Sequence, residues 1–192
     1  MPLFQRISAH FDEHQLTVQA AAESLAQPLA TAIERLTHCL FSNRRILVCG
    51  LGASHDDAVL LVRSLCDRFE LDRPPLAGLL LAAPAGADAL YVIKQLQALA
   101  HPGDTLVLLT GDYDDEALAC ALVDTAHSLD MAVIALTRPD DADLVARLGA
   151  ADLELQLPTQ RAARAHELRR LLVHCLCDGV DCLLLGVESH EA

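Results

Sequence analysis

The chain has 192 residues, of which 53% are hydrophobic and only 3% aromatic, and its formal charge is −13. This length suits one domain with a buried core, and the apolar content excludes a disordered chain. The negative charge argues against direct binding of nucleic acid, which requires clustered Lys and Arg. The seven cysteines form an odd set inside apolar runs, which indicates reduced core thiols. The chain shows no signal-peptide pattern and no apolar run of the roughly 20 residues that a membrane span needs, so we expect a cytoplasmic protein without membrane contact.

The first forty residues show a helical pattern. Apolar residues recur at alternating spacings of three and four from Phe4 to Leu25, as in a heptad pattern. Pro28 suits the first turn of a second helix, whose apolar residues up to Leu40 share one face. We therefore predict an N-terminal helical hairpin over residues 1–42. It packs on its own domain or, in the interpretation we favour, meets other subunits, because a helix ahead of a complete sheet domain has little to bury against.

From Arg45 onward, short apolar runs alternate with helical segments. Such an order, with right-handed crossovers, predicts a parallel sheet covered by helices on both faces. We predict an α/β fold: a three-layer αβα, flavodoxin-like, doubly wound five-stranded parallel sheet over residues 43–192, which forms a single domain with the hairpin. The expected strands are Ile46–Cys49, Leu76–Ala82, Thr105–Leu109, Ala132–Leu136 and Leu153–Leu157, and the expected helices cover about 54–69, 87–99, 114–129, 140–148 and 161–184.

The turn after the first expected strand is a candidate anion site. In such folds ligands bind beyond the carboxyl ends of the strands. Gly50 and Gly52 allow a tight turn there, and free amides at the start of the next helix could receive an anion. The spacing is not the full dinucleotide-binding fingerprint, because His55 stands where that pattern has Gly. Tight packing of the turn on the helix explains the glycines equally well.

The turn after the third expected strand, Thr110–Glu116, is acidic. Its four carboxylates satisfy the positive end of the helix dipole themselves and repel an incoming phosphate. Carboxylate oxygens could hold a metal ion, but the spacing matches no calcium loop. We therefore expect a solvated, self-capped helix start, and we expect neither a metal nor a cofactor.

Several segments together resemble the sugar isomerase (SIS) domain family, specifically its phosphoheptose isomerase branch. They are Cys49-Gly50-x-Gly52-x-Ser54, His101-Pro102-Gly103-Asp104, Pro158-Thr159-x-Arg161-x-Ala163-Arg164 and the stretch His174–Asp181. The resemblance covers nearly the whole chain. The last stretch is most similar to the DnaA initiator-associating proteins, a noncatalytic offshoot of that branch whose members are homotetramers that bind the replication initiator DnaA.

The resemblance implies that the isomerase's active-site pattern is altered in this chain. Leu51 stands in place of an Asn, Leu60 in place of a metal-binding His, and Ser64 in place of the catalytic Glu. His166 falls where the isomerase has a Gln ligand, and His174 matches its catalytic and metal-binding His. Aldose–ketose isomerisation needs a base, and Ser64 cannot replace a carboxylate in that role, so we expect no catalysis. His166 and His174 form at most half a metal site, and a core or interface pair is the simpler interpretation.

These observations leave more than one function open. The main expectation is a noncatalytic adaptor, a homotetramer or dimer of dimers, that promotes DnaA assembly through Leu184 and Leu185, unless those leucines only close the last helix on the core. The alternative is a phosphoheptose isomerase-like sugar-phosphate isomerase or sugar-phosphate sensor, with sedoheptulose 7-phosphate as its ligand. The third hypothesis is a relative of these proteins that has diverged from both roles and binds a different partner. The candidate ligand-binding residues are Gly50, Gly52, Ser54, His55 and Thr110.

Overall fold

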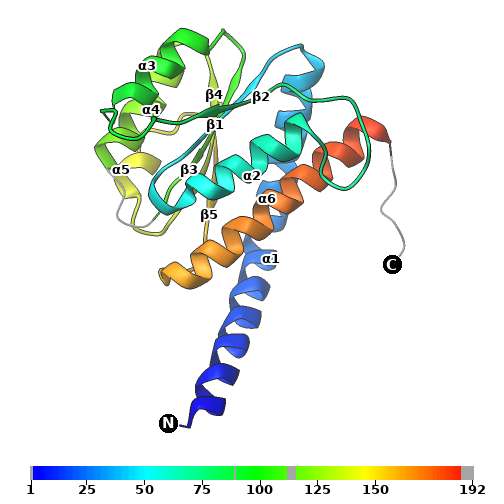
Figure 1. Cartoon of the computed structure of the whole chain (residues 1–192), viewed down its shortest axis with the longest axis vertical. Coiled ribbons are helices and arrows are strands. Elements are labelled where there is room, and N and C mark those ends of the chain that lie inside the picture. Colours follow the sequence, from blue (N-terminus) through cyan, green and yellow to red (C-terminus); the bar gives the residue numbers. More distant parts are fainter. Residues whose placement is uncertain (1, 89, 112–115, 187–192) are drawn as a thin grey trace.

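The computed structural model describes residues 2–88, 90–111 and 116–186 and confirms the predicted α/β fold. Five parallel strands in the order β2-β1-β3-β4-β5 lie between two layers of helices (Figure 1). The strands are β1 Ile46–Gly50, β2 Gly78–Leu81, β3 Thr105–Leu109, β4 Ala132–Thr137 and β5 Leu153–Gln156. The helices are α1 Leu3–Phe41, α2 His55–Cys66, α3 Leu90–Leu99, α4 Glu116–Ser128, α5 Ala142–Val145 and α6 Ala162–Leu185, with a 3₁₀ turn at Gly52–Ser54.

The sheet separates two hydrophobic cores. Alternate residues of each strand point to opposite faces, so that Val48 and Val107 face one core while Leu47 and Leu106 face the other. Helices α1, α2 and α6 cover the first face, and α3, α4 and α5 cover the second (Figure 1). Both cores are built mainly from Leu, Ala and Val, as the composition indicated. All seven cysteines are free thiols.

The N-terminal segment differs from the predicted hairpin, because α1 is one continuous helix with Pro28 in its interior. Proline removes one backbone hydrogen bond and costs about 3 kcal/mol in a helix. Leu25 before the proline and Leu29 and Leu36 after it are all buried in one core. A continuous helix keeps the apolar residues before and after Pro28 packed on the domain, whereas a helix broken at Pro28 would bury only one of these two groups. Close packing fixes the crossing with α6, since a Cβ built on Gly179 would lie 2.4 Å from Ile33 Cδ1.

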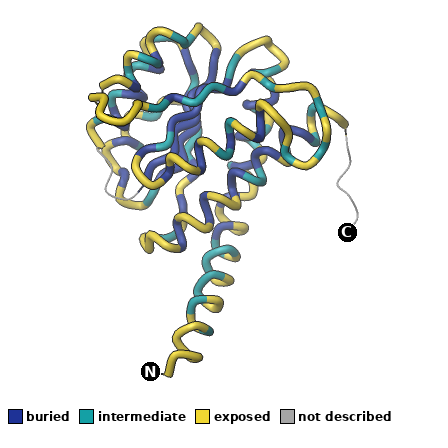
Figure 2. The backbone as a smooth tube through the Cα atoms, in the orientation of Figure 1, coloured by how far each residue is buried: buried dark blue, intermediate teal, exposed yellow. Residues whose placement is uncertain are grey.

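The first half of α1 extends beyond the sheet and is largely exposed (Figures 1 and 2). Large apolar side chains on this half face solvent, and they are Leu3, Phe4, Ile7, Phe11 and Leu16. The predicted heptad pattern therefore divides into a buried part near Leu25 and an exposed part near the N-terminus. Within the described ranges, none of the helices combines the length and apolar character that a bilayer crossing requires.

Candidate functional site

The turn after β1 lies where the strand order reverses, between β1 and β3. Gly50 is required there, because a Cβ would lie 2.3 Å from the carbonyl oxygen of Ser54. Gly52 has a positive φ of 52°, a conformation that glycine adopts without steric cost. The glycines that the sequence singled out are thus needed to fold the chain back into α2 directly at the strand end.

A buried hydrogen-bond chain joins the turns after β1, β3 and β4. Ser54 Oγ donates to the carbonyl oxygen of Thr110 at 2.7 Å, and Thr110 Oγ1 donates to Asp141 Oδ2 at 2.6 Å. The side chains of Ser54, Thr110 and Asp141 are all buried. Gly111 completes the contact, since a Cβ there would lie 2.6 Å from the carbonyl oxygen of Leu51. The hydroxyls of Ser54 and Thr110 therefore hold the three turns together, whereas they were predicted as ligand contacts.

The exposed part of the first turn consists of Gly52, Ala53 and His55. His55 begins α2, whose first turn also carries Asp56 and Asp57. These carboxylates compensate the helix dipole that would otherwise attract an anion. In the acidic turn after β3, Thr110–Glu116, residues 112–115 lie outside the described residues. The structure places Thr110 and Gly111 before them and the start of α4 at Glu116 after them.

A cavity of about 480 Å³ opens between the first turn of α2 and the second and third turns of α6. Asp57 is buried beside it, and its Oδ1 accepts hydrogen bonds from Arg170 Nε at 3.0 Å and Arg170 Nη2 at 2.8 Å. Arg169, which is fully buried, has its Nη1 3.8 Å from Asp57 Oδ2. The cavity thus combines an imidazole, exposed carboxylates and a guanidinium in one place. Its lining residues are Ala53, Asp56, Asp57, His166, Glu167 and Arg170.

Further along the same two helices the space is filled by the core. Leu60 packs against the buried apolar cluster. Ser64 is buried, and its carbonyl oxygen accepts a hydrogen bond from Arg73 Nη2 at 2.6 Å. His174 lies against Phe69, with ring centroids 5.6 Å apart. Leu60, Ser64 and His174, which the resemblance related to the isomerase's metal ligand, base and catalytic histidine, therefore lie in packed surroundings in this chain.

The two histidines on α6 have different surroundings. His166 is exposed and lines the cavity, whereas His174 is half-buried beside Phe69, two turns further along the helix. No group of three or more His, Cys, Asp or Glu side chains suited to a metal ion occurs among the residues that the structure describes. Within the described part of the chain, neither His166 nor His174 therefore belongs to a cluster of side chains that could hold a metal ion.

A second cavity, of about 240 Å³, lies at the ends of β3 and β4. Asp141 Oδ2 accepts a hydrogen bond from the amide of Arg138 at 2.7 Å, and Oδ1 pairs with Arg138 Nη2 at 3.3 Å. Sequence reasoning missed Asp141, Arg138, Asp57 and Arg170. One signal for Arg170 was available, since it follows His166 by four positions and so lies on the same helical face.

At the far end of α6, Leu184 packs against the core and Leu185 is exposed. The helix ends at Gly186, whose φ of 66° gives a left-handed cap. Of the two predicted partner contacts, only Leu185 therefore presents much apolar surface.

Known proteins similar to this chain share nearly its full length. It is 39% identical to a phosphoheptose isomerase of Azoarcus sp. strain BH72, over 98% of this chain and 100% of the relative. It is 40% identical, with the same coverage, to one of Aromatoleum aromaticum. Among solved structures, phosphoheptose isomerase GmhA of Neisseria gonorrhoeae superposes with a TM-score of 0.84 at 33% identity, covering 94% of this chain and 99% of that one. HobA of Helicobacter pylori in complex with DnaA domains I–II shares only the fold, with 14% identity and a TM-score of 0.55.

These relatives contradict the expected noncatalytic adaptor and the expected lack of enzymatic activity, because the full-length relatives bear the name of an enzyme. The DnaA-associated protein is similar at the level of the fold alone. The assignment of Leu184 and Leu185 to initiator contact depended on that adaptor function. The resemblance to the sugar isomerase family is confirmed: residues 9–138 match the model described as SIS domain, and the chain belongs to the SIS domain family.

Proposed function

We propose that this chain is a sugar-phosphate isomerase that interconverts the aldose and ketose forms of a phosphoheptose. The observation that carries the proposal is the 39–40% identity to phosphoheptose isomerases over 98% of the chain. The glycine turn at the carboxyl end of β1 supports it, because Gly50 and Gly52 keep the backbone close to the start of α2. Ligands of open α/β sheets bind at this place.

The cavity between α2 and α6 supplies groups for proton transfer. Aldose–ketose isomerisation moves a proton between adjacent carbons and needs a base within hydrogen-bond reach, usually with a partner acid. We assign the base to His166, an exposed imidazole in the cavity, with the exposed carboxylate of Asp56 as the acid–base partner. Glu167 suits this role less well, because it already pairs with His14 at 2.7 Å and with Arg164 at 2.7 Å.

The phosphate group needs a positive partner in the same cavity. Arg170 is suitable, because its side chain is 51% exposed while two of its nitrogens hold Asp57. That pairing fixes the guanidinium in one orientation and leaves part of its edge toward the cavity. Because Asp57 neutralises part of its charge, we expect Arg170 to orient the phosphate more than to supply most of the affinity.

Binding without catalysis is the second candidate function, and the surroundings of Ser64 favour it. The position that aligns with the isomerase's base is buried and packed between α2 and α6, with its carbonyl bonded to Arg73. A sensor would hold the sugar phosphate in the cavity and would need neither base nor acid.

Sedoheptulose 7-phosphate distinguishes these candidates. Incubation with the purified protein, followed by chromatography of the sugar phosphates, measures turnover, and thermal denaturation with the same ligand measures binding. An isomerase gives both. His166→Gln should then lower kcat by about 10²–10⁴-fold with little change in stability. His38→Gln, at an exposed histidine on α1 outside the lining of this cavity, should retain turnover. Thermal stabilisation without turnover supports the sensor. The absence of both stabilisation and turnover would contradict both candidate functions.

We further propose that residues 1–42 mediate self-association into a tetramer or dimer of dimers. The support is the exposed apolar surface of the first half of α1, where Phe4 is 78% and Phe11 67% exposed. Side chains of this size face water at a free-energy cost that a second copy of the helix would remove. Light scattering on the protein and on Phe4→Ser/Phe11→Ser should show an oligomer that dissociates in the variant. A monomeric parent protein would contradict this assignment.

A further inference from the structure

A further cavity lies at the opposite edge of the sheet from the glycine turns. It has a volume of about 780 Å³ and is formed by the last turns of α1 and the amino ends of β3 and β4. Thr105 begins β3 and Ala132 begins β4, whereas Gly50 and Thr110 stand at the carboxyl ends of their strands. No residue that lines this cavity also lines the cavities near the glycine turns. It therefore cannot be part of the proposed isomerase site.

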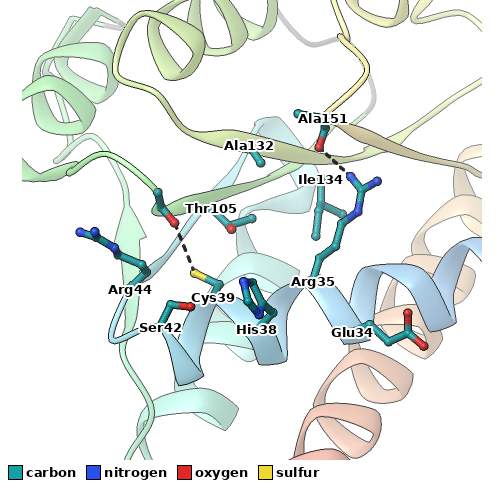
Figure 3. Close-up of a pocket in the computed structure, with 11 residues that line it drawn as sticks. Glu34, Arg35, His38, Cys39, Ser42, Arg44, Thr105, Ala132, Ile134 and Ala151 are labelled. Atoms are coloured by element: carbon teal, nitrogen blue, oxygen red, sulfur yellow. Dashed lines mark hydrogen bonds between the residues drawn. The ribbon is translucent and has the colours of Figure 1, made fainter.

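The cavity has an apolar floor and a polar rim (Figure 3). Ile134, Ala132 and Thr105 form the floor, and Ile134 and Thr105 are buried. The rim consists of the side chains of Arg35, His38, Ser42 and Arg44 together with Glu34. A volume in this range, with an apolar body and a few polar groups at its edge, is typical of small-molecule sites.

The rim carries more positive than negative charge, although the whole chain has a formal charge of −13. Two guanidiniums, those of Arg35 and Arg44, stand against the single carboxylate of Glu34. In Figure 3 the carboxylate of Glu34 points away from the strand ends. Arg35 is anchored, since its Nη1 donates to the carbonyl oxygen of Ala151 at 2.6 Å. A positively charged rim in an acidic protein favours an anionic ligand.

Arg44 is the group best placed to take a ligand. Its side chain is exposed, and across the described ranges its guanidinium has no hydrogen-bond or ion-pair partner, unlike that of Arg45 next to it, which holds Asp104. The Arg44 side chain packs closely over Gly103 at the rim, since a Cβ built on Gly103 would lie 3.2 Å from Arg44 Nε. A guanidinium presents several donors in a fixed plane, which matches a carboxylate or a phosphate.

The end of α1 does not oppose an anion as strongly as a helix C-terminus usually does. Unpaired carbonyl groups give such an end its negative character. Here the amides of Ser42, Asn43 and Arg44 donate to the carbonyl oxygens of residues 38, 40 and 39, each at 3.0 Å. Three of the last four carbonyl oxygens of the helix, those of residues 38–40, are thus already satisfied within the turn.

The floor also carries no thiolate. Cys39 lines the cavity, and its Sγ is within hydrogen-bond range of the carbonyl oxygens of Arg45 at 3.4 Å and Gly103 at 4.0 Å. Burial is the main cause that raises the pKa of the Cys39 thiol. The thiol therefore stays neutral at physiological pH and does not repel an anion.

We propose that this cavity is a second binding site, which takes a small organic anion: a carboxylate or phosphate monoester carried on an apolar body. The apolar body lies over Ile134 and Ala132, and the anionic group meets Arg44 and the free edge of Arg35. Ser42 adds a hydroxyl donor at the rim. The site is independent of the isomerase proposal, because it shares no lining residue with the cavity that contains His166.

Phenyl phosphate, benzoate and neutral benzyl alcohol serve as probes on the full chain. Calorimetric titration should show saturable binding of at least one anion and about tenfold weaker binding, or none, of the alcohol. Amide NMR shifts should appear at Ser42, Gly103 and Ala151. Stronger binding of phenyl phosphate than of benzoate would identify the ligand as a phosphate monoester, and the reverse order would identify it as a carboxylate.

The variant Arg44→Gln should weaken binding of the preferred anion about tenfold without a change in thermal stability, because the side chain is exposed and unpaired among the described residues. Arg63→Gln, an exposed arginine on α2 outside this cavity, is the matched control and should bind as the parent does. Equal affinities of the two variants would overturn the proposal. So would shifts confined to Gly52 and Gly111, or an absence of saturable binding by either anion.

Discussion

Thr110→Val tests whether the hydrogen-bond chain beneath the glycine turns holds the candidate site together. Valine keeps the shape of threonine and removes only the hydroxyl, which donates to Asp141 Oδ2 at 2.6 Å and lies 3.2 Å from the carbonyl oxygen of Leu136. A hydrogen bond to a charged group contributes about 1.5–3 kcal/mol. The group left behind is a buried carboxylate that keeps Arg138 as a partner. We therefore expect a loss of about 2 kcal/mol.

For a chain of this size that loss corresponds to a fall in Tm of about 4–8 °C. Thermal and urea denaturation at one fixed protein concentration measure it, since self-association would make Tm depend on concentration. Thr125→Val is the matched control, because its hydroxyl donates only to the carbonyl oxygen one turn earlier on α4. We expect a change below about 0.5 kcal/mol there. Equal Tm values for the two variants would refute the view that the chain from Ser54 to Asp141 stabilises the turns.

Three further predictions follow from buried groups. Asp181→Asn should cost about 3 kcal/mol in unfolding free energy, because it removes the only carboxylate that pairs with the buried guanidinium of Arg73 among the described residues and leaves it with backbone carbonyl partners alone. Asp124→Asn, in an exposed pair, should cost less than about 1 kcal/mol, and urea titrations compare the two variants. Burial raises the pKa of the Cys177 thiol to about 11 from 9.0, so the folded state holds this proton more tightly than the unfolded state does. The free energy of unfolding should therefore fall as the pH rises from 9 to 11, and Cys177→Ala should make this fall with pH less steep. Gly50→Ala should abolish sugar-phosphate binding in a thermal-shift assay, because its Cβ would meet a carbonyl oxygen at 2.3 Å, while Gly149→Ala, whose nearest neighbour is 3.6 Å away, should bind normally.

The sequence predicted β1, β3 and β4 well because each is a short apolar run with a sharp boundary. The expected strands Leu76–Ala82 and Leu153–Leu157 were too long, since the observed β2 and β5 are Gly78–Leu81 and Leu153–Gln156. Thr105–Leu109 is observed with the predicted bounds, and β1 and β4 each extend one residue further. These strands are buried on both faces, so their composition is almost independent of tertiary detail. Gly50 and Gly52 were identifiable for a related reason, since a reversal directly at a strand end requires glycine.

Long-range pairings and the path of α1 could not be predicted in the same way. Pro28 favours a helix start locally, and only the burial of Leu25 and Leu29 against one core explains why the helix continues. Asp57 and Arg170 are 113 positions apart, and nothing in either local pattern marks them as partners. The cavity beside Arg44 combines residues from α1, β3 and β4 that are remote in sequence.

Helices α2 and α6 run side by side in the same direction, and this packing decides where chemistry can occur (Figure 1). The first turn of α2 meets the third turn of α6 at the Asp57–Arg170 pair beside the cavity, and near the far ends of the two helices Arg73 reaches Asp181. Between these points the contact is filled by buried apolar side chains and by the buried Ser64. The cation nearest to this middle section, Arg73, is already held by the carbonyl oxygen of Ser64 at 2.6 Å and by Asp181 at 2.6 Å. Under the proposed isomerase function we therefore expect proton transfer beside the first turn of α2 and His166 on α6. This place is one to two helical turns nearer the strand ends than Leu60 and Ser64, which the resemblance related to the isomerase's metal ligand and base, and the activity of His166→Gln tests the expectation.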